Sequence, residues 1–361
     1  MPSTSEKLNL ITRNAVEVLT EQDFKEFLEN GVPMRGYIGV EPSGLFHMGW
    51  TVWASKVKDL MQAGAEMSIL WATWHAWIND KLGGKLENIN KCASYLQHCL
   101  KAIDVDMVKL KQIRAEEMVS DPDYWATVLK VGKNTTLARI KRALTIIGRV
   151  SSEAAIDPSK LIYPLMQVSD IFYLDLNVCL GGLDQRKAHV LAREVYKKID
   201  KPKPAAIHTP LLVGLQGGEK ATMKTKVERL MEIKMSKSKP ERCIFIHDTE
   251  EEVKQKVASA FCPPKLVEDN PVIELNRLCL FPIDKFALKV NRPASAGGTI
   301  EFYKFSDLEK AYREGSVHPL DLKNATADAL NKRLEPVRVY FAKTPEAKRL
   351  WEDIKNLTIT R

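Results

Sequence analysis

The sequence lacks the features that mark a membrane-spanning or secreted chain. None of its apolar runs reaches the roughly 20 residues that a transmembrane helix needs. The nearest is Ile69–Ile78, which is too short and contains His75. The first residues, Met1–Glu6, contain no apolar stretch, so we expect no secretory signal and a cytoplasmic protein.

Cysteine is scarce, and its spacing excludes the common metal motifs. The six cysteines, at positions 92, 99, 179, 243, 262 and 279, form no C-x-x-C pair and no zinc spacing. We therefore expect no protein-bound zinc and six reduced, mostly buried thiols. Cys92 and Cys99 are seven residues apart, hence on one helix face, which favours core packing.

Low-complexity segments and internal repeats are also missing. The 361 residues are 45% hydrophobic and 28% charged, which excludes disorder for most of the chain. This length predicts roughly two or three domains. Lys and Arg number 54 against 46 Asp and Glu, a net charge of +8. The excess favours RNA, DNA or an anionic membrane as a partner, although a basic globular protein would have the same balance.

Strand-like and helical segments alternate through the first two thirds of the chain. Residues 36–41 and 67–72 are predicted strands, and the helical pattern between them ends at Gly64. Such a βαβ unit makes the two strands parallel. The rhythm continues with predicted strands at 106–113, 175–180 and 205–213 and helices at 121–150, 158–174 and 185–198. It predicts an α/β fold with a doubly wound parallel sheet of the Rossmann-like kind.

The composition changes after Gly214. Residues 214–242 are polar and basic, and we predict a mobile surface loop there. Helices dominate beyond it, so we divide the chain into an α/β domain at 1–247 and a mainly helical domain at 248–361.

Three helix signals support the helical second domain. Thr249, followed by three glutamates, has the pattern of a helix start. Ser306–Glu309 has the pattern of a capping box, and Gly315 that of a helix end. Residues 319–340 are predicted to form the last long helix.

One motif, Pro42–Gly49, lies between the first predicted strand of the sheet and its helix. Free N–H groups at a helix start attract phosphate, and Gly44 and Gly49 allow close approach of backbone to a ligand. His47 supplies a hydrogen-bond donor for a phosphate oxygen. Alone this signal is weak, because a histidine before a helix is more often a surface or capping residue.

A second motif, Lys234–Ser238, lies in the basic segment. Two lysines and two serines on a mobile loop can close on the charge that develops on a leaving pyrophosphate. The plainer alternative is a solvated basic loop.

Together the two motifs resemble the "HIGH" and "KMSKS" signatures of class I aminoacyl-tRNA synthetases. His47–Trp50 matches the first except at its fourth position, where Trp50 replaces the second histidine, and residues 234–238 match the second in full. Three more segments resemble the tyrosyl-tRNA synthetases of the archaeal and eukaryotic type: Tyr37–Gly44, Tyr163–Asp170 and Gly181–Lys187. The resemblance extends from about residue 8 to about residue 338.

The resemblance implies a pocket for L-tyrosine. Tyr37 and Asp170 are expected to hold the phenol hydroxyl, which both donates and accepts hydrogen bonds. The full set implied for tyrosine is Tyr37, Glu41, His75, Tyr163, Gln167, Asp170 and Gln185. Plainer alternatives remain for Tyr37 as a core aromatic, for Asp170 as a carboxylate paired with arginine, and for His75 as a structural histidine.

The resemblance also implies an ATP site and a two-step reaction. The residues implied for ATP are Ser43, Gly44, His47, Gly49, Gly182, Asp184, Lys234, Met235, Ser236 and Lys237. Of these, His47, Lys234, Ser236 and Lys237 are expected to be catalytic, and Asp184 to bind a ribose hydroxyl. Tyrosine would react with Mg-ATP to give tyrosyl-adenylate, and the tyrosyl group would then pass to the 3′-terminal adenosine of tRNA(Tyr).

For tRNA the resemblance implies two binding regions. Arg142, Arg186 and Lys187 would contact the acceptor stem, while His318 and Asp321 would read the anticodon. Ala296 stands where the family often has an aromatic that stacks on an anticodon base. A helical insert at about 114–157 would contribute to the acceptor-stem site and form the interface of a homodimer.

Three other functions stay open on the sequence. A tryptophanyl-tRNA synthetase shares the fold, but Tyr37 and Asp170 suit a phenol better than an indole. A small nucleotidyltransferase shares the His47 type of phosphate site, but it has no use for the helical second domain. A tRNA-binding paralogue without catalysis has only Trp50 in its favour.

Overall fold

The chain divides into two compact units in the computed structural model, which describes residues 2–144, 157–217 and 226–357. The first unit contains residues 1–44, 56–210 and 350–361. The second contains residues 45–55 and 211–349. The predicted functional boundary at residue 247 is a different division, and it stays a prediction.

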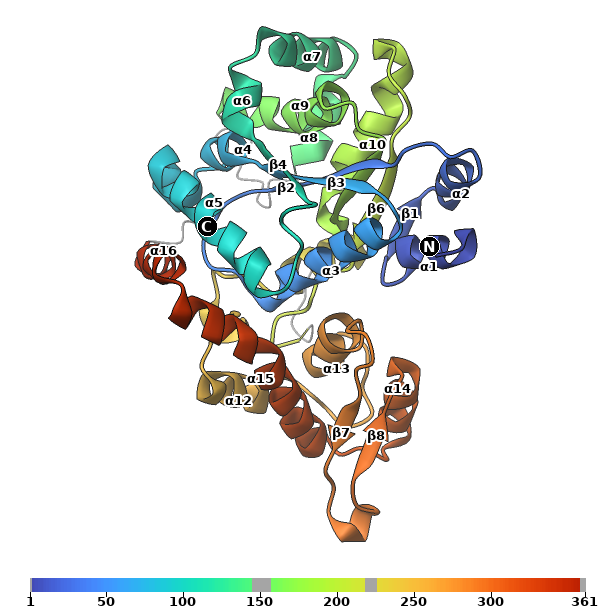
Figure 1. The fold of residues 1–361 in the computed structure, drawn as a ribbon, viewed down its shortest axis with the longest axis vertical. Helices are drawn as coiled ribbons and strands as arrows, with labels where there is room; N and C mark the ends of the chain where they lie inside the picture. Colours follow the sequence, from blue (N-terminus) through green and yellow to red (C-terminus); the bar gives the residue numbers. More distant parts are fainter. Residues whose placement is uncertain (1, 145–156, 218–225, 358–361) are drawn as a thin grey trace. The chain divides into compact units, whose positions relative to one another are not determined.

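A six-stranded sheet forms the centre of the first unit (Figure 1). Its strand order is β1-β6-β5-β2-β3-β4, and every neighbouring pair is parallel except β1 with β6. The strands are β1 (Glu17–Leu19), β2 (Arg35–Val40), β3 (Glu66–Trp71), β4 (Lys111–Arg114), β5 (Val178–Gly182) and β6 (Ala205–Thr209). The chain runs one way from β2 and the other way from β5, so a crevice is expected beyond the carboxyl ends of these two strands.

Helices cover this sheet, and Figure 1 draws α5 on the opposite side of the strands from α9. The helices whose residues fall wholly or partly in the first unit are α1 (Thr4–Thr12), α2 (Glu21–Glu29), α3 (Met48–Gln62), α4 (Thr73–Ile78), α5 (Leu86–Ala102), α6 (Ala115–Val119), α7 (Pro122–Lys133), α8 (Leu137–Ala143), α9 (Pro158–Tyr173), α10 (Arg186–Val195) and α16 (Pro345–Lys355). Apolar side chains of α7, α9 and α10 form one buried cluster with Tyr37, Cys179 and Ala206 of the sheet. The predicted doubly wound α/β fold is confirmed.

Four predicted segments of this unit need correction, and the first is the strand predicted at 175–180, which lies at Val178–Gly182. Residues 106–110 form turns, so the strand predicted at 106–113 is reduced to β4. The helix predicted at 121–150 is two helices, α7 and α8, because Asn134 ends the first and the Thr136 side chain caps the second; residues 145–156 lie outside the described part. The strand predicted at 205–213 ends at Thr209.

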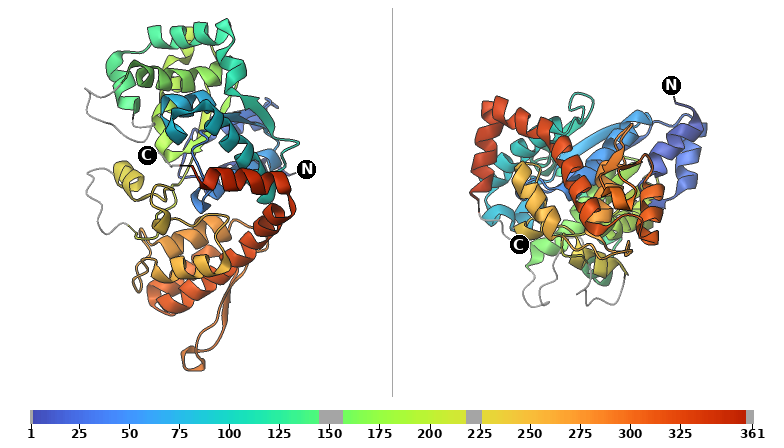
Figure 2. Two further views of the ribbon diagram at one scale, coloured as in Figure 1. Left: turned by 90° about the vertical axis from the view of Figure 1, so that its left-hand side faces the viewer. Right: turned by 90° about the horizontal axis from the view of Figure 1, so that it is seen from below.

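The second unit is built from helices and one small hairpin. Its helices are α11 (Lys226–Ile233), α12 (Glu250–Ser259), α13 (Pro271–Leu275), α14 (Phe305–Glu314) and α15 (Pro319–Lys343). Strands β7 (Leu288–Val290) and β8 (Ile300–Phe302) pair antiparallel. Figure 2 shows the loop of this hairpin reaching beyond the helices of its own unit.

Sequence signals placed some helix ends of this unit correctly and missed others. Thr249 caps α12 in a capping box, and Gly315 ends α14 with a φ of 87° that favours glycine. Ser306 is not a cap, because α14 already begins at Phe305 and the serine lies inside the first turn. The segment predicted as a loop at 214–242 contains α11, and α16 follows the helix predicted to be the last.

Two expectations about composition can be compared with the structure. All six cysteines are buried and free. Among the residues that the structure describes, no helix is both long and apolar enough to span a membrane.

Candidate functional site

The carboxylate of Asp170 is buried in the first unit, where α9 lies beside α4 and α7. Its Oδ1 accepts a hydrogen bond from the Tyr124 hydroxyl at 2.8 Å, and its Oδ2 lies 3.3 Å from His75 Nε2. Asp170 is 2% exposed and His75 3%. The described partners of Asp170 are thus a phenol and an imidazole, in place of the arginine that the plainer alternative required.

A second carboxylate, Glu41, follows β2 and lies on the same polar network. The Tyr163 hydroxyl donates to Glu41 Oε1, and Asn79 Nδ2 donates to Glu41 Oε2 at 3.2 Å. The Tyr163 ring packs edge-on against His75, with 5.1 Å between the ring centroids. Through these contacts Glu41, Tyr163, His75 and Asp170 form one continuous set.

Gln167 joins α9 to the segment that follows β5. Its Nε2 donates to Gln185 Oε1 at 3.1 Å, while its own Oε1 is buried without a described hydrogen-bond partner. The Tyr37 hydroxyl donates to the Gln167 backbone carbonyl at 3.4 Å. All seven side chains predicted to bind tyrosine therefore lie in the first unit. Four of them form the set from Glu41 to Asp170, Gln167 pairs with Gln185, and Tyr37 reaches the backbone of α9 instead of the Asp170 carboxylate.

Burial and charge set the protonation of these groups. Burial raises the pKa of Tyr37 and of Tyr163 well above the usual range, so both phenols stay protonated. Burial alone would lower the pKa of His75, but the nearby Asp170 and Glu41 carboxylates outweigh it and the pKa is raised. The pocket thus holds protonated phenols beside two carboxylates, which suits a ligand with a hydroxyl and an ammonium group.

Tyr124 is the functional candidate that the sequence did not reveal. It lies on α7, within the segment expected to form the acceptor-stem insert, and it is 1% exposed. Burial first, and then Asp170, raises its pKa, so the hydroxyl remains a donor. Nothing local marks Tyr124, because its partner is 46 residues away along the chain.

In the second unit the His47 segment is held against residues 244–246. Met48 N donates to the Ile244 carbonyl at 2.9 Å, and Ile246 N donates to the Phe46 carbonyl at 3.2 Å. These bonds flank a β-bridge between His47 and Phe245, so His47 enters α3 from a fixed backbone.

His47 is neutral and its tautomer is set by Gly49. Burial, followed by the charges of Lys237 and Lys234, lowers the pKa of His47 well below its usual value. Gly49 N donates to His47 Nδ1 at 3.2 Å, which leaves the proton on Nε2 as a donor. A Cβ at position 49 would lie 3.0 Å from the imidazole, so a larger residue there would press on the His47 ring.

The Lys234–Ser238 segment is anchored at its start. Lys234 forms a β-bridge with Val213, and Met235 N donates to the Leu212 carbonyl at 2.6 Å. The Met235 side chain is buried, while Lys234, Ser236 and Lys237 are partly exposed. Ser236 and Ser238 hydroxyls lie 3.1 Å apart, and Lys237 Nζ lies 4.1 Å from the centroid of the Trp50 ring. Lys237 therefore lies against Trp50, whose ring is next to that of His47, in the second unit.

The other residues predicted for ATP lie in the first unit. Gly44 has a φ of 121°, which only glycine adopts readily, and its N–H donates to Cys92 Sγ at 3.3 Å. Ser43 Oγ donates to the Glu41 carbonyl at 3.1 Å. Gly182 ends β5, and Asp184 follows it in a short turn of 3-10 helix, beyond the carboxyl end of that strand.

The residues predicted for tRNA lie on surface helices of both units. Arg142 on α8 and Lys187 on α10 are exposed, whereas Arg186 forms an ion pair with Glu17 at 2.8 Å. In the second unit His318 caps α15, with its Nδ1 accepting from Leu320 N at 3.2 Å, and Asp321 lies in the first turn.

Ala296 lies in the loop of the β7–β8 hairpin, in a short turn at Ala294–Ala296. Arg292 connects this loop to the start of α15, because it donates to the carbonyls of Gly298 and Ser316, each at 2.9 Å. The hairpin loop and the His318 region therefore belong to one surface of the second unit.

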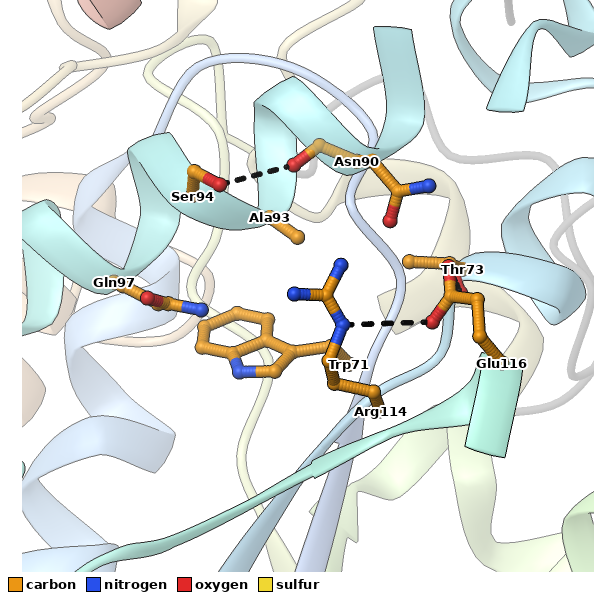
Figure 3. A pocket seen from close by; sticks show the side chains of 8 residues that line it. All are labelled: Trp71, Thr73, Asn90, Ala93, Ser94, Gln97, Arg114 and Glu116. Atoms are coloured by element: carbon orange, nitrogen blue, oxygen red, sulfur yellow. Dashed lines mark hydrogen bonds and ion pairs between the residues drawn. The ribbon is translucent and has the colours of Figure 1, made fainter. Parts of the chain in front are cut away.

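A separate hollow in the first unit lies beyond the carboxyl ends of β3 and β4 (Figure 3). It is lined by Trp71, Thr73, Asn90, Ala93, Ser94, Gln97, Arg114 and Glu116. Asn90 Oδ1 is buried there without a described hydrogen-bond partner, and Glu116 Oε2 lies 3.9 Å from Arg114 Nε in an ion pair. Its free volume of about 10 Å³ has room for one water, so we do not assign substrate to it.

In the described ranges, 2–144, 157–217 and 226–357, no three His, Cys, Asp or Glu side chains are arranged to hold a metal ion.

Comparisons with known proteins give one consistent result. The family description "tRNA synthetases class I (W and Y)" matches residues 29–335. The chain is 52% identical to a tyrosine–tRNA ligase of Saccharolobus islandicus over 362 residues, covering 99% of this chain and 100% of that one.

Two solved structures are similar over almost the full length. The tyrosyl-tRNA synthetase of Aeropyrum pernix is 45% identical with a TM-score of 0.88, covering 98% of this chain and 99% of that one. The tyrosyl-tRNA synthetase of Pyrococcus horikoshii complexed with L-tyrosine is 40% identical with a TM-score of 0.89, covering 97% of this chain and 100% of that one.

Proposed function

The chain belongs to the class I tRNA synthetases for tryptophan and tyrosine and is a tyrosine–tRNA ligase that uses ATP, and from this premise we propose how its residues perform the reaction. The observation that carries the substrate is the 52% identity to a tyrosine–tRNA ligase over nearly the whole chain. The same observation disfavours the tryptophanyl alternative and the nucleotidyltransferase.

We propose that the Asp170 network recognises the side chain of L-tyrosine. The carboxylate accepts a hydrogen bond from the substrate hydroxyl, and its fixed partners Tyr124 and His75 keep it in place. Tyr37 donates to the same hydroxyl after leaving the Gln167 carbonyl, to which its present bond is long at 3.4 Å. The polar pocket would then reject phenylalanine, since its burial would leave these groups unpaired.

The ammonium group of tyrosine would be bound at the other end of the network. Gln167, Gln185 and Tyr163 offer oxygen acceptors, and the buried Oε1 of Gln167 has no described partner. Glu41, which accepts a hydrogen bond from the Tyr163 hydroxyl, places a carboxylate next to these acceptors. A carbonyl, a phenol and a nearby carboxylate form the kind of acceptor set that a bound ammonium requires.

We propose that His47, Lys234 and Lys237 bind the triphosphate of Mg-ATP. His47 donates from Nε2, while the two ammonium groups balance charge that grows on the leaving pyrophosphate. Ser43, Gly44, Gly49, Met235 and Ser236 belong to the same two motifs and would bind ATP with them. Gly182 and Asp184, beyond the end of β5, would bind the ribose.

The reaction then proceeds in two transfers. A carboxylate oxygen of tyrosine attacks the α-phosphorus of ATP, the bond to the β-phosphate oxygen breaks, and tyrosyl-adenylate and pyrophosphate form. A hydroxyl of the 3′-terminal adenosine of tRNA(Tyr) next attacks the adenylate carbonyl and releases AMP. The residues assigned here act by positioning and charge stabilisation, without a covalent enzyme intermediate.

For tRNA we propose the two surfaces implied by the sequence. Arg142, Lys187 and Arg186 would bind the acceptor stem, with Arg186 aimed by its ion pair to Glu17. Asp321 would accept from a guanine edge in the anticodon, with His318 beside it. Since tRNA charging takes place in the cytoplasm, the predicted location there is retained as part of the proposal.

We further propose a homodimer through the outer surface of α7, α8 and α9. Four large apolar side chains on these helices are exposed, by 37% to 72%: Trp125, Leu129, Leu137 and Ile162. Exposed apolar groups gathered on adjacent helices favour burial against a second protein surface. Leu129→Glu is expected to convert a dimer to a monomer in sedimentation, whereas Val108→Glu, at an isolated exposed site, is expected to leave it dimeric. A wild-type monomer at micromolar concentration would contradict this proposal.

The proposed function is tested by ATP–pyrophosphate exchange with each of the twenty amino acids, without tRNA. We expect exchange with tyrosine and not with phenylalanine or tryptophan. Exchange with tryptophan would overturn the assignment of the Asp170 pocket. No exchange with any amino acid would instead support the tRNA-binding paralogue in which Trp50 has ended catalysis.

A further inference from the structure

The fourth position of the His47 motif carries an aromatic ring instead of the second histidine of the signature. Trp50 lies in the first turn of α3, three residues after His47, and the two ring centroids are 5.6 Å apart. Lys237, the second lysine of the other motif, places its Nζ 4.1 Å from the centroid of the same ring. The ring thus lies against both motifs, and all three residues belong to the second unit.

The orientation of the Trp50 ring is fixed by its neighbours. Phe46 packs against it edge-on, with centroids 5.4 Å apart and an interplanar angle of 82°. Trp53 packs from the next turn of the helix at 6.2 Å. Because these contacts hold the ring in one orientation, the same face of the ring is available to a cation.

The backbone near Lys237 is also fixed. Met235, two residues before Lys237, is buried, and its N–H donates to the Leu212 carbonyl. Lys239 N donates to the Ser236 carbonyl at 3.1 Å, which closes a turn around Lys237. Because the backbone is held in place here, conformational change at this position is mainly a change of the Lys237 side-chain rotamer.

The charges of His47 and Lys237 are consistent with a cation–π contact between Lys237 and Trp50. His47 is neutral, because burial and the two lysine charges lower its pKa. The indole face carries negative potential and attracts an ammonium group within about 6 Å. The contact at 4.1 Å is within that range.

We propose that Trp50 is a positioning residue for Lys237. Its ring holds the Lys237 ammonium beside His47 before ATP binds, so that the charge is already near the place where the triphosphate arrives. The cation–π contact is kept when phosphate binds on the other side of the ammonium group, and it restricts in advance the rotamers that lysine would otherwise lose on binding. This role rests on the proposed function of the two motifs. It gives Trp50 a function at the position where the signature has its second histidine.

The test is a double-mutant cycle on ATP–pyrophosphate exchange with Trp50→Leu, Lys237→Met and the double variant. Trp50→Leu is expected to raise the KM for ATP about 10-fold, the size of the rotamer entropy that an unrestrained lysine loses on binding, and to leave the KM for tyrosine unchanged. In the Lys237→Met background the same substitution is expected to change the KM for ATP by less than about 2-fold, because the contact is already lost. Trp50→Phe, which keeps a ring face, is expected to restore most of the affinity.

Trp53→Leu is the matched control. Trp53 lies on the same helix and in the same aromatic cluster, but the described contact with Lys237 is made by Trp50. We expect Trp53→Leu to lower the melting temperature and to raise the KM for ATP clearly less than Trp50→Leu does, because Phe46 still packs edge-on against the Trp50 ring. Equal effects of Trp50→Leu in both lysine backgrounds, or equal effects of Trp50→Leu and Trp53→Leu, would overturn the positioning role.

Calorimetric titration of the same variants with ATP separates this inference from the proposed function. Titration measures the coupling between Trp50 and Lys237 without turnover. Suppose that the wild-type protein shows no exchange but the variants show coupling between Trp50 and Lys237 in ATP binding. That result would overturn the catalytic proposal and keep the positioning role. Exchange with tyrosine but without coupling in either assay would do the reverse.

Discussion

Replacing Lys234 and Lys237 together with alanine is expected to slow tyrosyl-adenylate formation by about 10³-fold. Removing a single preorganised donor to developing charge typically costs about 10²- to 10³-fold, and groups that act on one leaving group are not additive. Tyrosine binding should persist, because the residues assigned to it lie in the other compact unit. The measurement is the single-turnover rate of adenylate formation, with tyrosine affinity determined separately by equilibrium titration.

Lys239 provides the matched control for the two lysines. It is exposed and lies directly after the motif, on the same segment and with the same charge. Lys239→Ala removes one unit of positive charge and is expected to keep the rate within about 2-fold, since exposed charges are screened by salt. If the double variant also stayed within about 2-fold of wild type, the assignment of these lysines to the leaving pyrophosphate would be wrong.

The sheet and its longest helices could be predicted because their apolar residues follow a regular period. Strands β2 and β3 are mainly apolar and mostly buried after their first residue, as expected for the inner strands of a parallel sheet. Helix α9 begins with Pro158 after the capping Asp157, a start signal that is visible in the chain. In these segments the local preference and the global packing agree.

Segments without enough local signal were missed or misplaced. Strands β7 and β8 have three residues each, too few to show an alternating pattern, and they exist because they pair with one another. Ser306 has the residue type of a cap, but the helix already begins at Phe305, so the serine is one position too late. The edge strand β1 pairs with β6 almost 200 residues away, as Glu17 with His208, and no spacing within the chain indicates this.

The candidate site shows the same division between local and distant information. His47 and the Lys234–Ser238 motif were found from their residue types and order along the chain. The contact between Trp50 and Lys237 joins positions far apart in sequence, so the meaning of the unusual tryptophan emerged only from the structure. The sequence shows that Trp50 departs from the signature, and the structure shows that the cation next to its ring is Lys237.

Asp170→Asn is expected to raise the KM for tyrosine about 10- to 100-fold, the range set by losing a hydrogen bond to a charged group of about 1.5–3 kcal/mol. The amide has almost the same shape, so the buried packing of α9 is kept. It has no negative charge for the substrate hydroxyl, and one of its two oxygen acceptors is replaced by a donor. The preference for tyrosine over phenylalanine in ATP–pyrophosphate exchange is expected to fall by a similar factor, because only tyrosine uses the lost acceptor.

Tyr124→Phe tests whether Asp170 depends on the partner that the sequence did not reveal. It removes one hydroxyl that donates to Asp170 and keeps the ring, so we expect about a 5- to 10-fold increase in the KM for tyrosine. Tyr173→Phe is its control, because Tyr173 packs edge-on against Tyr124 at 5.4 Å but donates to Asp121 instead. An unchanged ratio of tyrosine to phenylalanine exchange in Asp170→Asn would assign the phenol to another acceptor. Equal effects of Tyr124→Phe and Tyr173→Phe would mean that the α7–α9 packing, and not the Tyr124 hydroxyl, holds the carboxylate in place.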